Sequence, residues 1–292
     1  TCALPILNPG DEVLVPSPYW VSYPHQIRMA DGTPKYIETS DQTQFKITAE
    51  QFEAAITDKT KVLILNSPSN PTGMLYTEAE LKAIAEVAIK HQILIISDEI
   101  YEHLVYEGEH FSIASVSEEA KELTIVVNGV SKAYSMTGWR IGYCAAPADI
   151  AKAMNKIQSH STSNPTAASQ WASVEALNGS QAPVEEMRKA FDERRQFMVN
   201  KLNEIPGITC LMPQGAFYAF PNISGTFGKS SANGSIQSSA DFCQNLLKEA
   251  LVACVPGSGF GGEGYIRLSY ATSLEQIEKS VSRISDWVNK LT

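Results

Sequence analysis

Short apolar runs alternate with helical patterns through the first half of the chain. The runs at 12–16, 61–66, 93–97 and 123–127 are rich in Val, Leu and Ile, which is typical of strands covered on both faces of a sheet. The first run is expected to end at its proline. Because helical patterns separate these runs, the sequence predicts an α/β fold with a mostly parallel sheet and helices on both faces.

One of the predicted helices, at about 78–90, has a well-defined start. Thr77 is a good N-cap residue, and Glu80 three residues later completes a capping box. The face expected to be buried carries Leu81, Ile84, Ala85 and Ala88. The pattern therefore predicts an amphipathic helix after the loop of Pro, Ser, Asn and Gly at 67–73.

The second half of the chain has longer helical stretches, predicted at 147–158, 166–178 and 182–204. The third is rich in Arg and Glu and is interpreted as a solvent-facing connector. The shorter elements predicted after it are strands at 208–211, 216–220, 251–255 and 265–270, a polar loop at 224–236, and helices at 239–250 and from Ser273. We therefore predict a large domain over 1–178 and a smaller C-terminal α+β domain over 179–292.

Charge and hydropathy argue against several classes of protein. The 292 residues include 23 Lys and Arg against 32 Asp and Glu, a net charge of −9, so a nucleic-acid-binding surface is not expected. No apolar run approaches the length of about 18 residues that indicates a membrane span. The start, at 1–4, has neither Met nor a basic segment, so we expect no signal peptide and a chain that begins inside a longer protein.

Cysteine and histidine spacing gives no sign of a metal site. The five cysteines are far apart, with no CxxC pair, and are expected to be reduced thiols in a cytoplasmic protein. The five histidines lack metal-ligand spacing. Residues 257–262 (GSGFGG) match the GxGxxG pattern, but a strand is predicted to follow where a dinucleotide-binding loop needs a helix, so we reject this motif.

Polar and aromatic residues follow four of the predicted strands, and ligands of open α/β sheets bind beyond such strand ends. These side chains are an indole, an amide, a carboxylate, a phenol, a hydroxyl, an amine and a guanidinium: Trp20, Asn70, Asp98, Tyr101, Ser131, Lys132 and Arg140. Simpler structural interpretations exist for single members, since Asp98 could cap a helix, Asn70 could only form a turn, and Trp20 could belong to the core.

One ligand would use all of these groups, namely pyridoxal 5'-phosphate (PLP). A lysine desolvated beside other cations has a lowered pKa and can bond to an aldehyde. A carboxylate can hold a protonated ring nitrogen, a phenol and an amide can bond a ring oxygen, and a hydroxyl with a guanidinium suits a phosphate. The indole suits stacking on the ring, which itself serves as the electron sink.

Three segments resemble the fold-type-I, class I and II aminotransferases: 70–73 (NPTG), 97–101 (SDEIY) and 131–142 (SKAYSMTGWRIG). Further segments resemble most the bacterial-type aspartate aminotransferases: 18–24 (PYWVSYP), 101–103 (YEH) and 266–271 (IRLSYA). The resemblance runs from about residue 8 to the C-terminus, and the lysine motif is its most specific part.

The resemblance implies a role for each candidate residue. Lys132 would bond covalently to PLP and carry a proton between substrate and cofactor carbons. Asp98 would contact the ring nitrogen of PLP, and Asn70 and Tyr101 its ring oxygen. Ser131 and Arg140 would bind the phosphate, and Trp20 would stack on the ring face. Asn70 and Arg267 would also bind the substrate, with Arg267 on its α-carboxylate. Cis peptide bonds are implied at Ser17–Pro18 and Asn70–Pro71.

The implied activity is transfer of an amino group from aspartate to 2-oxoglutarate by a cytoplasmic homodimer with small-molecule substrates and no nucleic-acid or membrane partner. Prephenate, aromatic or alanine transamination and β-lyase activity stay open, as does a PLP-binding domain of a transcription regulator. Family members carry further chain upstream of the position of Thr1. The large domain is therefore expected to be N-terminally incomplete, and an inactive truncation is a third alternative.

Overall fold

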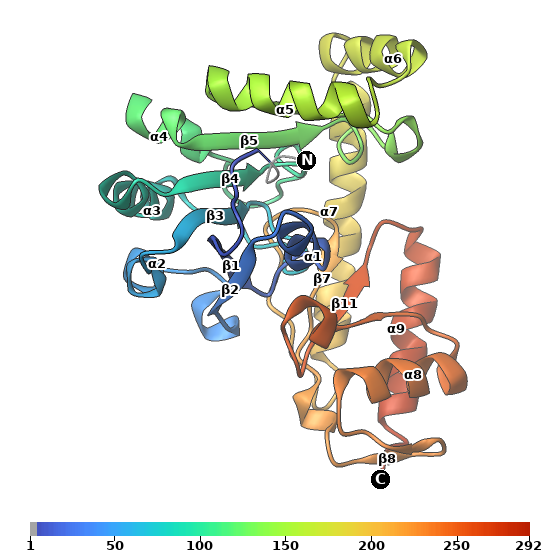
Figure 1. The fold of residues 1–292 in the computed structure, drawn as a ribbon. Coiled ribbons are helices and arrows are strands. Elements are labelled where there is room, and N and C mark those ends of the chain that lie inside the picture. Colours follow the sequence, from blue (N-terminus) through green and yellow to red (C-terminus); the bar gives the residue numbers. More distant parts are fainter. Residues whose placement is uncertain (1–4) are drawn as a thin grey trace.

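A six-stranded sheet forms the larger part of the computed structural model, which describes residues 5–292 (Figure 1). Its strands are β1 (Glu12–Ser17), β2 (Thr33–Glu38), β3 (Thr60–Asn66), β4 (Leu94–Asp98), β5 (Thr124–Gly129) and β6 (Gly142–Ala145), in the sheet order β2-β1-β3-β4-β5-β6. Only the pair of β5 and β6 is antiparallel. The predicted mostly parallel sheet is confirmed, whereas the expectations for 1–4, including Cys2, lie outside the described residues.

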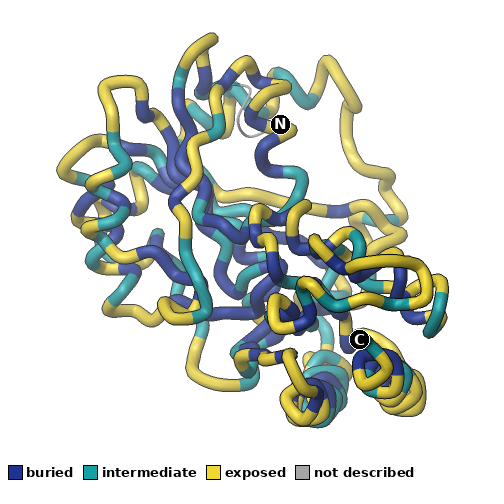
Figure 2. Tube along the Cα trace, turned by 90° about the horizontal axis from the view of Figure 1, so that it is seen from below, coloured by how far each residue is buried: buried dark blue, intermediate teal, exposed yellow. Residues whose placement is uncertain are grey.

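The central strands of this sheet are buried on both faces, and successive residues of a strand point to opposite faces. Leu63 and Leu65 of β3 belong to one apolar cluster, and Val62 and Ile64 belong to another. The first cluster includes residues of α2 (Ala49–Ala55), α3 (Glu78–His91) and α4 (Glu118–Glu122), and the second includes residues of α1 (Ser22–Met29) and α5 (Ala148–Ser161). Figure 2 shows the buried positions gathered in the interior and the exposed positions on the outer loops and turns. Helices therefore cover both faces, as predicted.

Helix α3 has the start and the buried face that the sequence predicts. The backbone N–H of Glu80 donates to the Thr77 hydroxyl oxygen at 3.3 Å, and the Thr77 N–H donates to the Glu80 carboxylate at 2.7 Å. Leu81, Ile84, Ala85 and Ala88 are all buried. The capping box therefore satisfies two N–H groups that the first turn would otherwise leave unpaired.

The C-terminal part contains a second, antiparallel sheet with the order β10-β11-β7. It consists of β7 (Tyr218–Ala219), β10 (Val255–Pro256) and β11 (Ile266–Ser269), with helices α7 (Ala182–Asn203), α8 (Ser239–Ala250) and α9 (Leu274–Val288). In Figure 1 the yellow α7 runs from the region of α6 (Ala167–Asn178) toward α8 and α9. A division at 178/179 agrees with this arrangement and stays a proposal.

Several predicted elements differ from the structure in detail. β1 passes through Pro16 to Ser17, and it pairs with β3 only over Glu12–Leu14, so Pro16 lies where the strand has a single neighbour. The strand predicted at 208–211 is wrong: Thr209 forms only an isolated bridge with Asn222. Of the strand predicted at 251–255, only Val255 is a strand residue, in β10, which continues to Pro256.

Two interpretations of polar segments are also wrong. Helix α7 is not a simple solvent-facing connector, because Phe191, Met198 and Leu202 are buried in the C-terminal core. The loop predicted at 224–236 contains a small hairpin of β8 (Ser230–Ser231) and β9 (Gly234–Ser235). The sequence pattern missed α1, β2, α2, α4 and β6 altogether.

One edge of the molecule is open to solvent. All four residues of β6 are exposed, and α5 has no fully buried residue. On the elements beside them, Trp139 and Trp171 are 50% and 74% exposed. Among the described helices, none is long and apolar enough to cross a membrane.

Candidate active site

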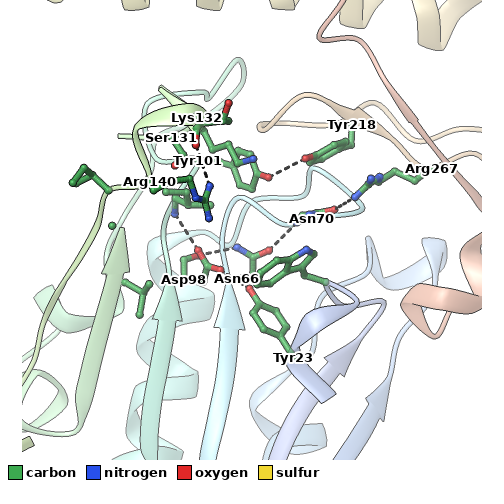
Figure 3. Close-up of a pocket in the computed structure, with 16 residues that line it drawn as sticks. Tyr23, Asn66, Asn70, Asp98, Tyr101, Ser131, Lys132, Arg140, Tyr218 and Arg267 are labelled. Carbon is green, nitrogen blue, oxygen red and sulfur yellow. Dashed lines mark hydrogen bonds between the residues drawn. The ribbon is translucent and has the colours of Figure 1, made fainter. Parts of the chain in front are cut away.

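A cavity of about 480 Å³ opens where β3, β4 and β5 end (Figure 3). All eight candidate residues from the sequence line it, together with eight others. The lining consists of Trp20, Tyr23, Asn66, Asn70, Asp98, Ile100, Tyr101, Val127, Ser131, Lys132, Thr137, Arg140, Ile141, Gly142, Tyr218 and Arg267. The parallel strands bring these residues together because their carboxyl ends meet at one edge of the sheet.

Asp98, the last residue of β4, presents its carboxylate at the base of the cavity. Its Oδ2 accepts a hydrogen bond from the Tyr23 hydroxyl at 2.6 Å, and its Oδ1 accepts one from the backbone N–H of Ile100 at 3.2 Å. Burial raises the pKa of the Asp98 carboxyl above its ordinary value, although both hydrogen bonds act in the opposite direction. A cationic partner in the cavity would therefore stabilise the charged form of this group.

Lys132 follows β5 and is half-buried at the cavity wall. Burial, and after it the positive charges of Arg267 and Arg140, lowers the pKa of the Lys132 amine. Its Nζ lies 5.7 Å from the centre of the Phe217 ring. A lysine in such surroundings has an increased neutral fraction, which is the nucleophilic form.

The opposite side of the cavity joins residues that are distant in the chain. An Arg267 nitrogen donates to Asn70 Oδ1 at 2.9 Å, and its guanidinium lies over the Tyr218 ring at 4.5 Å. The Tyr218 and Tyr101 hydroxyls are 3.1 Å apart. Arg267 therefore occupies a fixed position between two aromatic rings and an amide, since the Phe260 ring lies 4.9 Å away.

The remaining candidates lie at the cavity's rim and side. Ser131 and the exposed Arg140 line it together, and Arg140 donates to the Thr137 carbonyl at 3.0 Å. Trp20 is half-buried and packs edge-to-face on Tyr23, with ring centres 5.3 Å apart. Ser17–Pro18 and Asn70–Pro71 are cis, as implied, and a third cis bond joins Ser67 to Pro68.

The comparisons with known proteins place this geometry in a family. The family described as "Aminotransferase class I and II" matches residues 1–284. The chain belongs to the class I and II aminotransferases. It is a PLP-dependent transaminase.

Individual relatives of this aminotransferase agree with that membership. An aspartate aminotransferase of Bacillus sp. (strain YM-2) is 58% identical over 97% of the chain and 71% of the relative. An aspartate/prephenate aminotransferase of Nitrosomonas europaea is 48% identical over 97% of the chain and 72% of the relative. The crystal structure of the aspartate aminotransferase from Rhizobium meliloti aligns with a TM-score of 0.96 at 44% identity, over 100% of this chain and 74% of the other.

The side chains of this aminotransferase fit PLP. A carboxylate whose pKa is raised by burial faces the cavity, and an amine with a lowered pKa stands on another wall. A hydroxyl and a guanidinium for a phosphate lie at the rim, as Ser131 and Arg140. These side chains thus supply a partner of complementary charge or hydrogen-bonding character for the ring nitrogen, the aldehyde and the phosphate of the cofactor.

The sequence reasoning missed three residues of this site. Tyr23 bonds Asp98, Asn66 donates to the Asp98 carbonyl at 2.9 Å and accepts from the Asn70 N–H at 2.8 Å, and Tyr218 joins Tyr101 to Arg267. Tyr23 lies inside the segment 18–24 and Asn66 ends a predicted strand, so both had a signal. Tyr218 had none beyond its place in a predicted strand.

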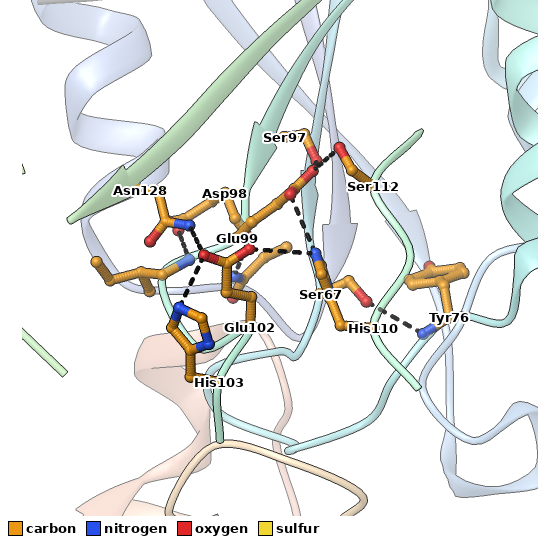
Figure 4. A network of polar contacts seen from close by, with 12 residues as sticks. Ser67, Tyr76, Ser97, Asp98, Glu99, Glu102, His103, His110, Ser112 and Asn128 are labelled. Atoms are coloured by element: carbon orange, nitrogen blue, oxygen red, sulfur yellow. Dashed lines mark hydrogen bonds and ion pairs between the residues drawn. The ribbon is translucent and has the colours of Figure 1, made fainter. Parts of the chain in front are cut away.

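A polar network lies directly behind Asp98 in this aminotransferase (Figure 4). The buried Glu99 accepts hydrogen bonds from the hydroxyls of Ser97 at 2.8 Å and Ser112 at 2.7 Å, and its other oxygen lies 3.0 Å from His110 Nε2. Glu102 accepts from Asn128 at 2.7 Å. These bonds tie the end of β4 and the turn after it, which carry Asp98 and Tyr101, to the segment 110–112 and to β5.

Three side chains of this network are close enough together to hold a metal ion, and they form the one such group among residues 5–292. One ligand atom each of Glu99, Glu102 and His110 lies within 4.8 Å of the others. Protein donors already occupy both oxygens of Glu99. The expectation of no metal site stays a prediction.

Proposed function

We propose that this aminotransferase transfers the amino group of aspartate to 2-oxoglutarate, with Lys132 as the catalytic residue. The observation that carries the proposal is the placement of Lys132, Asp98 and Arg267 around one cavity, where burial and, after it, two guanidinium groups lower the pKa of the lysine amine. The identity of 58% to an aspartate aminotransferase supports the choice of an acidic substrate.

The proposed work of each residue follows from its chemistry. Arg267 binds the substrate α-carboxylate, and its bond to Asn70 holds the guanidinium plane in place. Asp98 keeps the ring nitrogen protonated, since a buried carboxylate gains from a cationic neighbour. PLP, when bound, supplies an aldehyde that reacts with amines and a ring that accepts an electron pair.

Lys132 is proposed to move the proton. Its Nζ would accept the proton from the substrate Cα, which requires a neutral amine, and would hold that proton for its return to the reacting group. The lowered pKa increases the neutral fraction near neutral pH. Asn70 and Tyr101 are proposed to bond the ring oxygen, Ser131 and Arg140 the phosphate, and Trp20 the ring face.

A homodimer in the cytoplasm is also part of the proposal. Trp139, Tyr143 and Trp171 are 50%, 42% and 74% exposed on neighbouring elements, and large exposed aromatic side chains are typical of protein interfaces. No nucleic-acid or membrane partner is proposed, because the net charge of −9 disfavours polyanions.

Single-turnover spectroscopy of the full-length PLP-loaded enzyme tests the substrate. Aspartate, alanine, phenylalanine and arogenate are each mixed with the enzyme, and the change in cofactor absorbance is followed. Aspartate is expected to react about tenfold or more faster than alanine or phenylalanine, and 2-oxoglutarate to restore the first spectrum. A faster reaction with alanine or phenylalanine, or no recovery with 2-oxoglutarate, contradicts the proposal.

Prephenate is a second candidate keto acid, because the relative from Nitrosomonas europaea is an aspartate/prephenate aminotransferase. The same single-turnover experiment distinguishes prephenate from 2-oxoglutarate as the keto acid. Arogenate, its transamination product, would then react at a rate comparable to aspartate, and prephenate would restore the first spectrum.

A further inference from the structure

Two thiols lie against each other in the C-terminal part, away from the residues that line the cavity. Cys243 is buried in α8, and Cys254 is half-buried on the segment that follows this helix. Their sulfur atoms are 3.2 Å apart. A disulfide bond is about 2.05 Å long, so the sulfurs need to approach by only about 1.2 Å to bond.

The surroundings of the pair decide which side moves. Helix α8 is held at its start, because the Ser239 N–H donates to the Glu263 carboxylate at 2.6 Å and the Ser239 hydroxyl oxygen accepts from the Ser258 N–H at 3.2 Å. Cys254, in contrast, lies outside any helix or strand. The approach of the two sulfurs therefore moves mainly Cys254 and the residue after it.

That next residue connects the thiol pair to the active site. Val255 begins β10 and pairs in register with Arg267 of β11. The Arg267 side chain reaches Asn70 at 2.9 Å and lines the cavity. A shift of Cys254 is therefore transmitted through one backbone pair to the guanidinium that is proposed to bind the substrate.

We propose that Cys243 and Cys254 are a site of reversible disulfide formation, and that the bond weakens carboxylate binding by displacing β10 and with it Arg267. The second half of this statement rests on the proposed function of Arg267. The site takes a low-molecular-weight disulfide, such as oxidised glutathione, as its oxidant.

The chemistry is two successive thiol–disulfide exchanges. The Cys254 thiolate attacks one sulfur of the oxidant, which releases one small thiol and leaves a mixed disulfide on Cys254. Cys243 then attacks the Cys254 sulfur and releases the second small thiol. Two cysteine thiols are oxidised, one small disulfide is reduced to two thiols, and the two protons end on the released thiols.

The difference in exposure between the two cysteines and the raised pKa of the Cys243 thiol decide which thiol attacks the oxidant first. Cys254 is the more exposed residue of the two. The hydrogen bond from Cys254, and after it burial, raises the pKa of the Cys243 thiol well above its ordinary value. Cys243 is therefore the poorer first nucleophile, and the formation of the mixed disulfide removes that hydrogen bond before its turn.

The test uses the full-length PLP-loaded enzyme, equilibrated in buffers with increasing ratios of oxidised to reduced glutathione. The expected result is an intact mass lower by about 2 Da and a cross-linked peptide pair that contains Cys243 and Cys254. The KM for aspartate and the dissociation constant of succinate are expected to rise about fivefold or more, and dithiothreitol to reverse both changes.

Three variants serve as controls. Cys243→Ser and Cys254→Ser are each expected to abolish the mass change and the affinity change, whereas Cys144→Ser, in β6, is expected to keep both. Absence of the cross-linked peptide at every ratio overturns the site. A cross-link without a change in succinate affinity overturns the coupling to Arg267, and a failure to transaminate aspartate in both redox states overturns the proposed function alone.

Discussion

The Arg267 guanidinium donates a hydrogen bond to the side-chain oxygen of Asn70, although 197 residues separate the two in the chain. This bond joins β11 of the C-terminal sheet to the loop after β3 of the large sheet. The contact between Arg267 and Asn70 therefore closes one side of the active-site cavity. Because Arg267 is proposed to bind the substrate, a change in how the large sheet and the C-terminal sheet pack together is expected to change substrate affinity.

The first prediction concerns that arginine. Arg267→Lys keeps the positive charge but removes the planar fork, and is expected to raise the KM for aspartate by about tenfold to a hundredfold, the range for a charged hydrogen-bonded pair of ~1.5–3 kcal/mol. Steady-state kinetics of the PLP-loaded enzyme measure it. Arg283→Lys in α9 is the control, because Arg283 lies outside the cavity lining. An unchanged KM in Arg267→Lys would remove this residue from the substrate site.

The second prediction concerns the charge on Lys132 in the cofactor-free protein. Because the folded state lowers the pKa of this amine, its protonated form is less favourable there than in the unfolded chain. Lys132→Met is therefore expected to raise the free energy of unfolding at pH 7, by less than about 1 kcal/mol since the side chain is half exposed.

The sign of its pH dependence follows from the same shift. The unfolded chain keeps its proton up to the ordinary lysine pKa, so the wild type gains stability as pH rises from the lowered pKa toward the ordinary one. The advantage of Lys132→Met is expected to shrink over that alkaline range. Urea unfolding at several pH values measures it, with the exposed Lys279→Met as control. An advantage that grows with pH would contradict the direction of the shift.

The third prediction concerns the network behind Asp98. Glu99→Leu leaves the Ser97 and Ser112 hydroxyls and the His110 imidazole without their acceptor, and is expected to cost about 3 kcal/mol of unfolding free energy. Because Glu99 precedes the turn to Tyr101, PLP affinity is expected to fall as well. Val281→Ala, in the buried face of α9, is a destabilising control that should leave PLP affinity unchanged. Equal PLP affinities in both variants would show that the network does not position Asp98.

The fourth prediction concerns Gly73, which ends the loop 70–73. Its φ is +70°, and an added Cβ would lie 2.5 Å from Pro213 Cβ and 2.8 Å from the Gly215 carbonyl oxygen. Gly73→Ala is expected to cost about 2–4 kcal/mol of unfolding free energy from strain and overlap together.

Gly108 provides the matched control for this substitution. It has a φ of +82°, but its Cβ would meet only Leu75 at 3.5 Å. Gly108→Ala is therefore expected to cost about 1 kcal/mol from backbone strain alone. Denaturant titration compares the two variants, and equal losses would mean that the loop does not pack tightly on residues 213–215.

The central strands and the residues at their ends could be predicted because burial on both faces leaves a nearly continuous apolar run. Asp98 follows one such run directly, and Lys132 lies five residues beyond the end of another. The edge strands could not be predicted, since β2 has a single fully buried residue, Ile37, and β6 has none. An edge strand with few covered positions carries little apolar signature in the sequence.

The contacts inside the cavity were the least predictable part. Tyr23 reaches Asp98 from the eight-residue helix α1, and Tyr218 reaches Tyr101 from a two-residue strand. Elements this short are fixed by the packing around them more than by local periodicity. The sequence indicates the chemistry at the strand ends, while the partners of those groups follow from tertiary structure.

The most direct measurement is to reduce the PLP-loaded full-length enzyme with borohydride and to map the labelled peptide by mass spectrometry. Reduction fixes the cofactor on the amine that holds it. A single pyridoxyl label on Lys132 is expected, and no such label in Lys132→Met. A label on any other lysine, or the same label in that variant, would contradict the assignment of the active site.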